Sequence, residues 1–235
     1  MGDYFIFNGT KSTDKGIVLK EYRPIFLANN RINYKEIPGR DGSLEGPNAG
    51  KQDVIIRCTV AIIGDNIIQA TEAANDWLDQ KGELKFYDME DKYYIGRVTG
   101  EVSMKNQEAW GDFELNFRCS PYKISTTEKT VNLGDQGYNQ GTYNTPGLIT
   151  VNLSEAATSL EVKLQETGEK VRIEDSLKDT DIIEIDLEAE TVKKNGQLIQ
   201  EKITLESDFF KIPTGPFKIT TTEGTGTVKF RERWK

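Results

Sequence analysis

The stretch Val54-Ile-Ile-Arg-Cys-Thr-Val-Ala-Ile-Ile63 decides how the first half of this 235-residue chain is interpreted. Successive side chains of a β-strand point to opposite faces, so a period of two along a segment indicates a strand. One face of this stretch consists of apolar residues alone: Val54, Ile56, Cys58, Val60 and Ile62. The pattern predicts a strand with one buried face, on which Cys58 serves as a small apolar residue.

A polar segment, residues 36–50, precedes this strand and follows an extended approach at residues 31–37. It contains Pro38-Gly39 and Asp41-Gly42 in close succession, and both pairs favour tight turns. Few of its residues are apolar, so its own domain offers it little stabilisation. We interpret it as a long turn or arm without regular structure that contacts a neighbouring subunit. The candidate contact residues are Ile37, Pro38, Gly39, Arg40, Asp41 and Gly42. A surface loop without a partner is the alternative.

One segment after the strand has helical periodicity. Asp65 and Asn66 can cap it, apolar residues recur at spacings of three and four as far as Trp77, and Gly82 stands where a helix commonly ends. Further strands are predicted at residues 4–8, 17–19, 84–87, 93–104 and 113–119. In the last of these, Cys119 falls on the apolar side, so we expect both cysteines to be buried thiols.

The composition changes after Pro121-Tyr122. Residues 123–145 are rich in Thr, Asn, Gln and Gly and are interpreted as a linker, with the first loops of the next unit as the alternative. From residue 146 onward short apolar strands alternate with tight turns, including Asn195-Gly196, a strong hairpin signal. The predicted organisation is an N-terminal domain at residues 1–122, a linker at 123–145 and an all-β sandwich at 146–235.

The composition excludes several classes of site. The chain has no histidine, which removes the commonest general base and most zinc sites, and its two cysteines lack neighbours at metal-ligand spacing. The carboxylates of residues 88–91 lack the central glycine and distal glutamate of a calcium loop. We therefore predict no enzyme, no cofactor and no metal. A glycosidase using two carboxylates is an alternative that the 38 acidic residues leave open.

The charge distribution and the length of the apolar runs indicate whether the protein binds nucleic acid, enters a membrane or is secreted. The net charge of −8 is divided evenly between the two halves, whereas a nucleic-acid-binding face needs clustered cations. No apolar run approaches the roughly 20 residues that a membrane helix requires. The N-terminus lacks the basic start and apolar middle of a signal peptide. We expect a protein without sequence-specific nucleic-acid binding, membrane insertion or signal-peptide secretion.

Five segments, in this order and spacing, resemble the distal tail proteins of flexible, long-tailed bacteriophages (siphophages) that infect Gram-positive bacteria. The segments are Phe5-Ile-Phe-Asn-Gly9; Ile37-Pro-Gly-Arg-Asp-Gly42; Gly111-Asp-Phe-Glu-Leu-Asn-Phe-Arg-Cys-Ser-Pro-Tyr122; Ile185-Asp-Leu187 with Asn195-Gly196 and Ser207-Asp-Phe-Phe210; and Phe230-Arg-Glu-Arg-Trp234. The resemblance covers nearly the whole chain.

The resemblance implies a mainly β protein: an N-terminal ring-forming β-sandwich with one helix and a protruding hairpin arm, and a C-terminal galectin-like or carbohydrate-module-like sandwich. It also implies a structural protein of the virion, assembled in the host cytoplasm. Six copies would form a ring that joins the tail tube protein to the tail-associated hub and receptor-binding proteins, with DNA passing through its centre. A carbohydrate-binding adhesin that uses the C-terminal sandwich is the alternative function.

Overall fold

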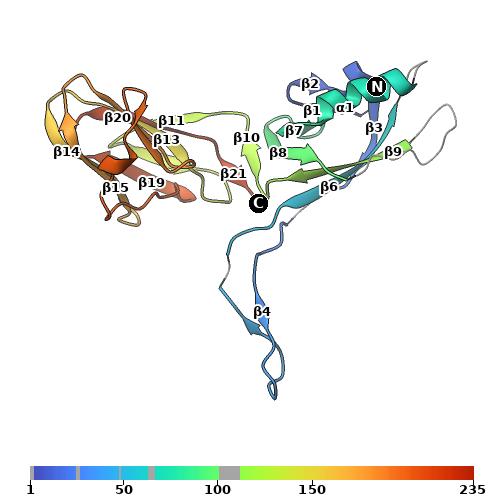
Figure 1. Ribbon diagram of the computed structural model, residues 1–235, viewed down its shortest axis with the longest axis horizontal. Helices are drawn as coiled ribbons and strands as arrows, with labels where there is room; N and C mark the ends of the chain where they lie inside the picture. Colours follow the sequence, from blue (N-terminus) through green and yellow to red (C-terminus); the bar gives the residue numbers. More distant parts are fainter. Residues whose placement is uncertain (1–2, 25–26, 48, 63–66, 101–111) are drawn as a thin grey trace. The chain divides into compact units, whose positions relative to one another are not determined.

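The computed structural model describes residues 3–24, 27–47, 49–62, 67–100 and 112–235 (Figure 1). The chain divides into two compact units, residues 1–123 together with Lys235, and residues 124–234. Each unit has a hydrophobic core built from its own residues.

The first unit is a curled antiparallel sheet with one α-helix. Its elements are β1 (Phe5–Phe7), β2 (Thr10–Lys11), the 3₁₀ turn η1 (Ser12–Lys15), β3 (Ile17–Tyr22), β4 (Tyr34–Lys35), β5 (Leu44–Glu45), β6 (Val54–Ile62), α1 (Ile67–Leu78), β7 (Gly82–Phe86), β8 (Lys92–Val98) and β9 (Asp112–Cys119). The strand order is β2-β1-β7-β8-β9-β6-β3. Asp3, just before β1, bridges to Leu19 of β3, and the Leu19 N–H donates to the Asp3 carbonyl at 3.0 Å. The sheet therefore curls back on itself around its core.

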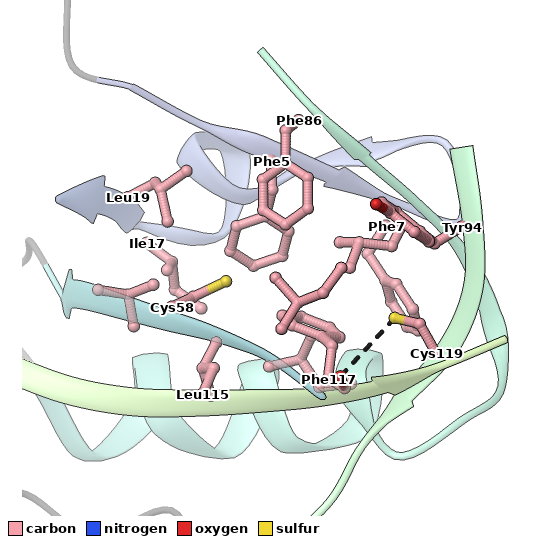
Figure 2. Close-up of a cluster of buried hydrophobic side chains, with 14 of the residues drawn as sticks. Phe5, Phe7, Ile17, Leu19, Cys58, Phe86, Tyr94, Leu115, Phe117 and Cys119 are labelled. Carbon is pink, nitrogen blue, oxygen red and sulfur yellow. Dashed lines mark hydrogen bonds between the residues drawn. The ribbon is translucent and has the colours of Figure 1, made fainter. Parts of the chain in front are cut away.

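The predicted apolar face of β6 lies in this core, as Figure 2 shows for Cys58 and its neighbours. Helix α1 contributes Trp77, whose ring stacks on Phe5 at 5.6 Å and whose Nε1 donates to the Phe7 carbonyl at 3.0 Å. The prediction of two buried, unpaired thiols is confirmed for Cys58 and Cys119. Burial raises the pKa of each thiol to about 12.

The interpretation of Gly82 as the end of the helix is wrong. Helix α1 ends at Leu78, and Gly82 is the first residue of β7. A Cβ at Gly82 would lie 1.8 Å from the side-chain oxygen of Asn8, which accepts a hydrogen bond from the Glu83 N–H at 2.9 Å. Close packing of Asn8 is therefore the reason for glycine here. Ile63 and the predicted capping residues Asp65 and Asn66 lie outside the described residues.

The second unit is a sandwich of two antiparallel sheets. Its elements are β11 (Lys129–Asn132), β12 (Gln136–Asn139), β13 (Gly147–Asn152), β14 (Ala157–Leu164), β15 (Lys170–Leu177), β16 (Ile182–Asp186), β17 (Thr191–Lys194), β18 (Gln197–Leu198), the 3₁₀ turn η2 (Gln200–Lys202), β19 (Gly215–Thr221) and β20 (Thr225–Phe230). Two short strands, β10 (Lys123–Ser125) and β21 (Arg233–Trp234), pair with each other outside these two sheets. One sheet has the order β11-β20-β13-β16-β17-β18 and the other β12-β19-β14-β15. Asn195 and Gly196, both with positive φ, form the predicted hairpin turn between β17 and β18. The mainly β fold with one described helix and two β domains is thus confirmed.

The interpretation of residues 123–145 as a linker is wrong, because this segment holds β10, β11 and β12. Strand β11 pairs with β20, and β12 pairs with β19, so both sheets of the sandwich extend into it. Asn139 is buried, and its amide donates to the carbonyls of Ile212 at 3.4 Å and Pro213 at 3.1 Å. Backbone pairing and this buried amide order a segment whose side chains are too polar for apolar periodicity to reveal its strands.

Candidate functional site: a hairpin arm

The candidate contact residues lie at the tip of a two-stranded hairpin, hereafter the arm (residues 27–52). Figure 1 shows β4 within this hairpin, which the chain enters from β3 and leaves into β6. The Arg23 N–H donates to the Arg57 carbonyl at 3.0 Å, where the β3–β6 ladder ends. Pairing resumes where the Gln52 N–H donates to the Asn29 carbonyl at 2.8 Å. The arm is therefore an outward extension of the β3–β6 hairpin.

The segment predicted to lack regular structure contains a short strand. Leu44 and Glu45 of β5 pair with Lys35 and Tyr34 of β4. Closer to the base, the Gly46 N–H donates to the Asn33 carbonyl at 2.8 Å. The expectation of an irregular arm is thus corrected: backbone hydrogen bonds can form a ladder without apolar side chains, so the polar sequence conceals it.

The tip is a tight turn around Pro38-Gly39, as predicted. The Arg40 N–H donates to the Ile37 carbonyl at 3.1 Å, and Gly39 has a φ of +81°. Proline at the second position and a glycine with positive φ at the third are typical of a type II turn. Gly42, with a φ of +75°, then returns the chain towards β5. The structure thereby brings all six predicted contact residues, 37–42, together in one turn, and all six are exposed.

The arm presents apolar and charged groups that its own unit does not use. Its large exposed apolar side chains are Leu27, Tyr34, Ile37 and Leu44, and Tyr34 is 64% exposed. Leu27 and Tyr34 were not singled out from the sequence. The available signal was a large apolar residue just before the polar approach, Leu27, and another within it, Tyr34. Arg40 and Asp41 form no ion pair with any residue that the structure describes. The arm offers a partner both apolar area and unpaired charge.

The rest of the described chain holds few features of a chemical site. Residues 3–24, 27–47, 49–62, 67–100 and 112–235 contain no group of three or more Cys, Asp or Glu side chains placed to hold a metal. The Asp88 carboxylate accepts hydrogen bonds from the Tyr22 hydroxyl at 2.6 Å. Burial, and then this carboxylate, raise the pKa of Tyr22. No helix in the described part has the length and apolar character needed to cross a bilayer.

Two family models divide the chain between them. Residues 8–119 match the phage tail protein RIFT-related domain, and residues 140–234 match the C-terminal domain of the siphovirus-type tail component. The chain belongs to the siphovirus-type tail components. No curated protein matches it.

Solved structures support the same fold for this tail component. The crystal structure of SPP1 Dit (gp 19.1), a hub protein of the adsorption apparatus in phages that infect Gram-positive bacteria, is similar with a TM-score of 0.85 and 20% identity over 100% of both chains. A chain of the phage p2 baseplate in its activated conformation with Sr is similar with a TM-score of 0.53 and 11% identity, over 97% of this chain and 98% of that chain. At these identities the likeness concerns the fold.

The resemblance to distal tail proteins is thus confirmed, and the protein is a structural component of a phage tail or baseplate. Of the two solved relatives with this fold, one is described as a hub of the adsorption apparatus and the other belongs to a baseplate. The comparisons favour this role over that of a carbohydrate-binding adhesin. They concern a structural family and contain no indication of catalysis.

Proposed function

We propose that this tail component forms a closed ring of six identical copies that joins the tail tube to the host-recognition apparatus and lets DNA pass through its centre. The arm of each copy would contact the next copy through the turn at residues 37–42. A contact that uses different surfaces on the two partners generates a ring when the rotation closes. The arm carries the proposal, because it is a paired hairpin with no core of its own.

The energetics of the arm support an external partner. A two-stranded hairpin in water is at best marginally stable by itself. Every described residue from Asn33 to Glu45 is exposed, so packing against its own unit contributes little. Tyr34, Ile37 and Leu44 are 64%, 39% and 44% exposed, so burying them against a neighbour would each contribute only a part of the about 1.5–3 kcal/mol that full burial of a fully exposed apolar side chain gives. Arg40 and Asp41 would then set the register of the contact through charge-assisted hydrogen bonds.

The charge of the chain supports passage of DNA without binding. The net charge is −8, and a channel built from such subunits repels phosphates on average. A ring through which DNA passes should bind the DNA only weakly. Clustered Lys and Arg side chains in the channel would contact the phosphates and hold the DNA back.

The test is to replace residues 32–47 with a four-residue Gly-Ser turn and, separately, to make Arg40→Glu. We expect both variants to melt near the wild-type temperature, because residues 32–47 include no buried side chain. We also expect both to lose ring formation, measured by native mass spectrometry and electron microscopy. Lys193→Glu, an exposed charge reversal on the second unit, is the matched control for Arg40→Glu and should assemble normally.

Two outcomes would contradict the proposal at different levels. If both arm variants assemble as the wild type does, the arm is a surface loop and the ring closes through other contacts. If the wild-type chain stays monomeric at high concentration with and without its neighbouring tail proteins, and virion images show no ring at the tail tip, the ring itself is wrong.

A further inference from the structure

Two surfaces of the first unit each gather charged side chains, mainly basic on one and acidic on the other. One is a group of arginines on the outward side of β6, β8 and β9, hereafter the arginine face (Arg57, Arg97 and Arg118). The other is the solvent side of α1, hereafter the acidic stripe (Glu72, Asp76 and Asp79). The basic surface also includes Glu21 and Glu114, which line one cavity with Arg57.

The arginine face is produced by strand register. Arg97 of β8 lies directly opposite Arg118 of β9, and like charges in this position destabilise a sheet. Arg118 is relieved by Asp53, whose Oδ2 lies 2.8 Å from the arginine Nε. Arg57 and Arg97 are exposed and form no ion pair with the residues that the structure describes. Ile55, 49% exposed and opposite Arg118, adds apolar area to this face.

The acidic stripe follows from helical spacing. Glu72, Asp76 and Asp79 recur at intervals of four and three residues, so they lie along one side of α1 and just past its end. The helix has no basic residue in its last turn, although the partial negative charge at a helix C-terminus favours cations there. All three carboxylates are exposed, and none has an ion-pair partner within the described residues. No ion pair among the described residues offsets their mutual repulsion.

The two surfaces lie on opposite sides of the unit. Ala74 and Leu78 of α1 line one cavity with Val60 and Leu115, which belong to the buried faces of β6 and β9, and Asp76 and Asp79 are exposed at the edge of this cavity. The arginines occupy the alternate positions of their strands, so they point away from α1. A surface on one side of a subunit and its complement on the other side can repeat from copy to copy around a ring.

The spacing of the charges also agrees. Arg57 and Arg97 are two strands apart and offset by two residues, which places their Cα atoms about 12 Å from each other. Glu72 and Asp79 are seven residues apart, which is about 10 Å along a helix. Two guanidinium groups can therefore reach two carboxylates of the stripe at once.

We propose that the acidic stripe of α1 in one copy docks on the arginine face of the next copy. The occupant of each surface is thus a second copy of this chain. The inference rests on the proposed ring and names a contact within it that is separate from the arm. Guanidinium–carboxylate pairs at this interface would relieve the repulsion on both surfaces and give the ring its direction.

Charge reversal in complementary variants tests this docking. One variant is Arg57→Glu with Arg97→Glu, and the other is Asp76→Lys with Asp79→Lys. We expect each alone to lower the assembled fraction at least tenfold in native mass spectrometry. We expect an equimolar mixture to restore rings in which the two variants alternate, because each reversed surface then meets its complement. Lys193→Glu with Lys229→Glu changes the net charge as the first variant does, at exposed positions of the second unit, and should assemble normally.

A cross-link provides the second measurement. When Arg57→Cys and Asp76→Cys variants are mixed and mildly oxidised, we expect a disulfide between copies, since the native thiols are buried. Rings that persist in both charge variants, or a mixture that fails to recover, would overturn this docking and leave the ring intact. A wild-type chain that never assembles would remove the proposed function, and this inference with it.

Discussion

Alkaline pH should destabilise the first unit through its two buried thiols. Burial raises the pKa of Cys58 and of Cys119 from 9.0 to about 12. Unfolding exposes both groups to water, where their pKa returns to its ordinary value. The thiols therefore stay protonated in the folded chain and ionise in the unfolded chain as the pH passes 9. Because the folded pKa is the higher one, the stability contribution is complete below pH 9 and is lost as the pH rises towards 12.

The expected loss follows from these values. Between pH 8 and pH 10 the ionisation of each thiol lowers the free energy of unfolding by about 1.4 kcal/mol, so the two thiols together lower it by about 2.7 kcal/mol. The assay is urea unfolding in reducing buffer at the two pH values, followed by tryptophan fluorescence. The double variant Cys58→Ala with Cys119→Ala is the reference, because every other titrating group is common to both proteins. Each single variant should remove about half of the difference.

The comparison uses the change in the free energy of unfolding between pH 8 and pH 10 in each protein. The packing cost of the alanine substitutions is the same at both pH values, so it cancels. Burial, and then the neighbouring Cys119, raise the pKa of Tyr94 to about 12. Because burial is the larger cause, Tyr94 stays protonated in the folded chain at pH 10 in both proteins. If the wild type and the double variant lose equal stability between pH 8 and pH 10, the thiols are not the protonated core groups described above.

Two further predictions concern the second unit. Asn139→Asp places a carboxylate against the carbonyls that the Asn139 amide now contacts, and should cost about 3 kcal/mol or more at pH 7. Burial raises the pKa of such a carboxyl, so thermal denaturation should show stability returning as the pH falls to 4, whereas a variant equally unstable at both pH values would contradict this. Residues 124–235 expressed alone should give a β-type circular dichroism spectrum and a cooperative melt, since their core draws on no residue of the first unit; a fragment without a cooperative transition would show that the units depend on each other.

The sequence predicts those strands in which burial enforces a period of two. Strand β6 is the clearest case, because five alternate residues pack into one core. Strand β9 is predictable from its own alternation of apolar and polar residues, and the β17–β18 hairpin from its Asn195-Gly196 turn. The signal lies within each segment, so no knowledge of its neighbours is needed.

The elements that the sequence does not predict are held by partners distant in the chain. Strands β11 and β12 are polar edge strands, ordered by backbone pairing with β20 and β19. Gly82 is required by Asn8, 74 residues earlier, which no local rule connects to a helix end. The arginine face arises only when register brings Arg57, Arg97 and Arg118 onto adjacent strands. The turn at residues 37–42 was predictable, because proline and glycine determine it locally.

The arm and the arginine face share strand β6, and this connection bears on how a ring would assemble. The β3–β6 ladder, from which the arm extends, ends where the Arg23 N–H donates to the Arg57 carbonyl, and Arg57 itself points outward from β6. A neighbour that holds the arm tip would fix the base of the hairpin, and with it the direction of the Arg57 side chain. We therefore expect the two contacts to depend on each other. A cycle that combines Arg40→Glu with Arg57→Glu should give a combined loss of assembly different from the sum of the separate losses, because both contacts act through β6 and the hairpin that extends from it. Strict additivity would mean that the arm and the arginine face act through independent parts of the unit.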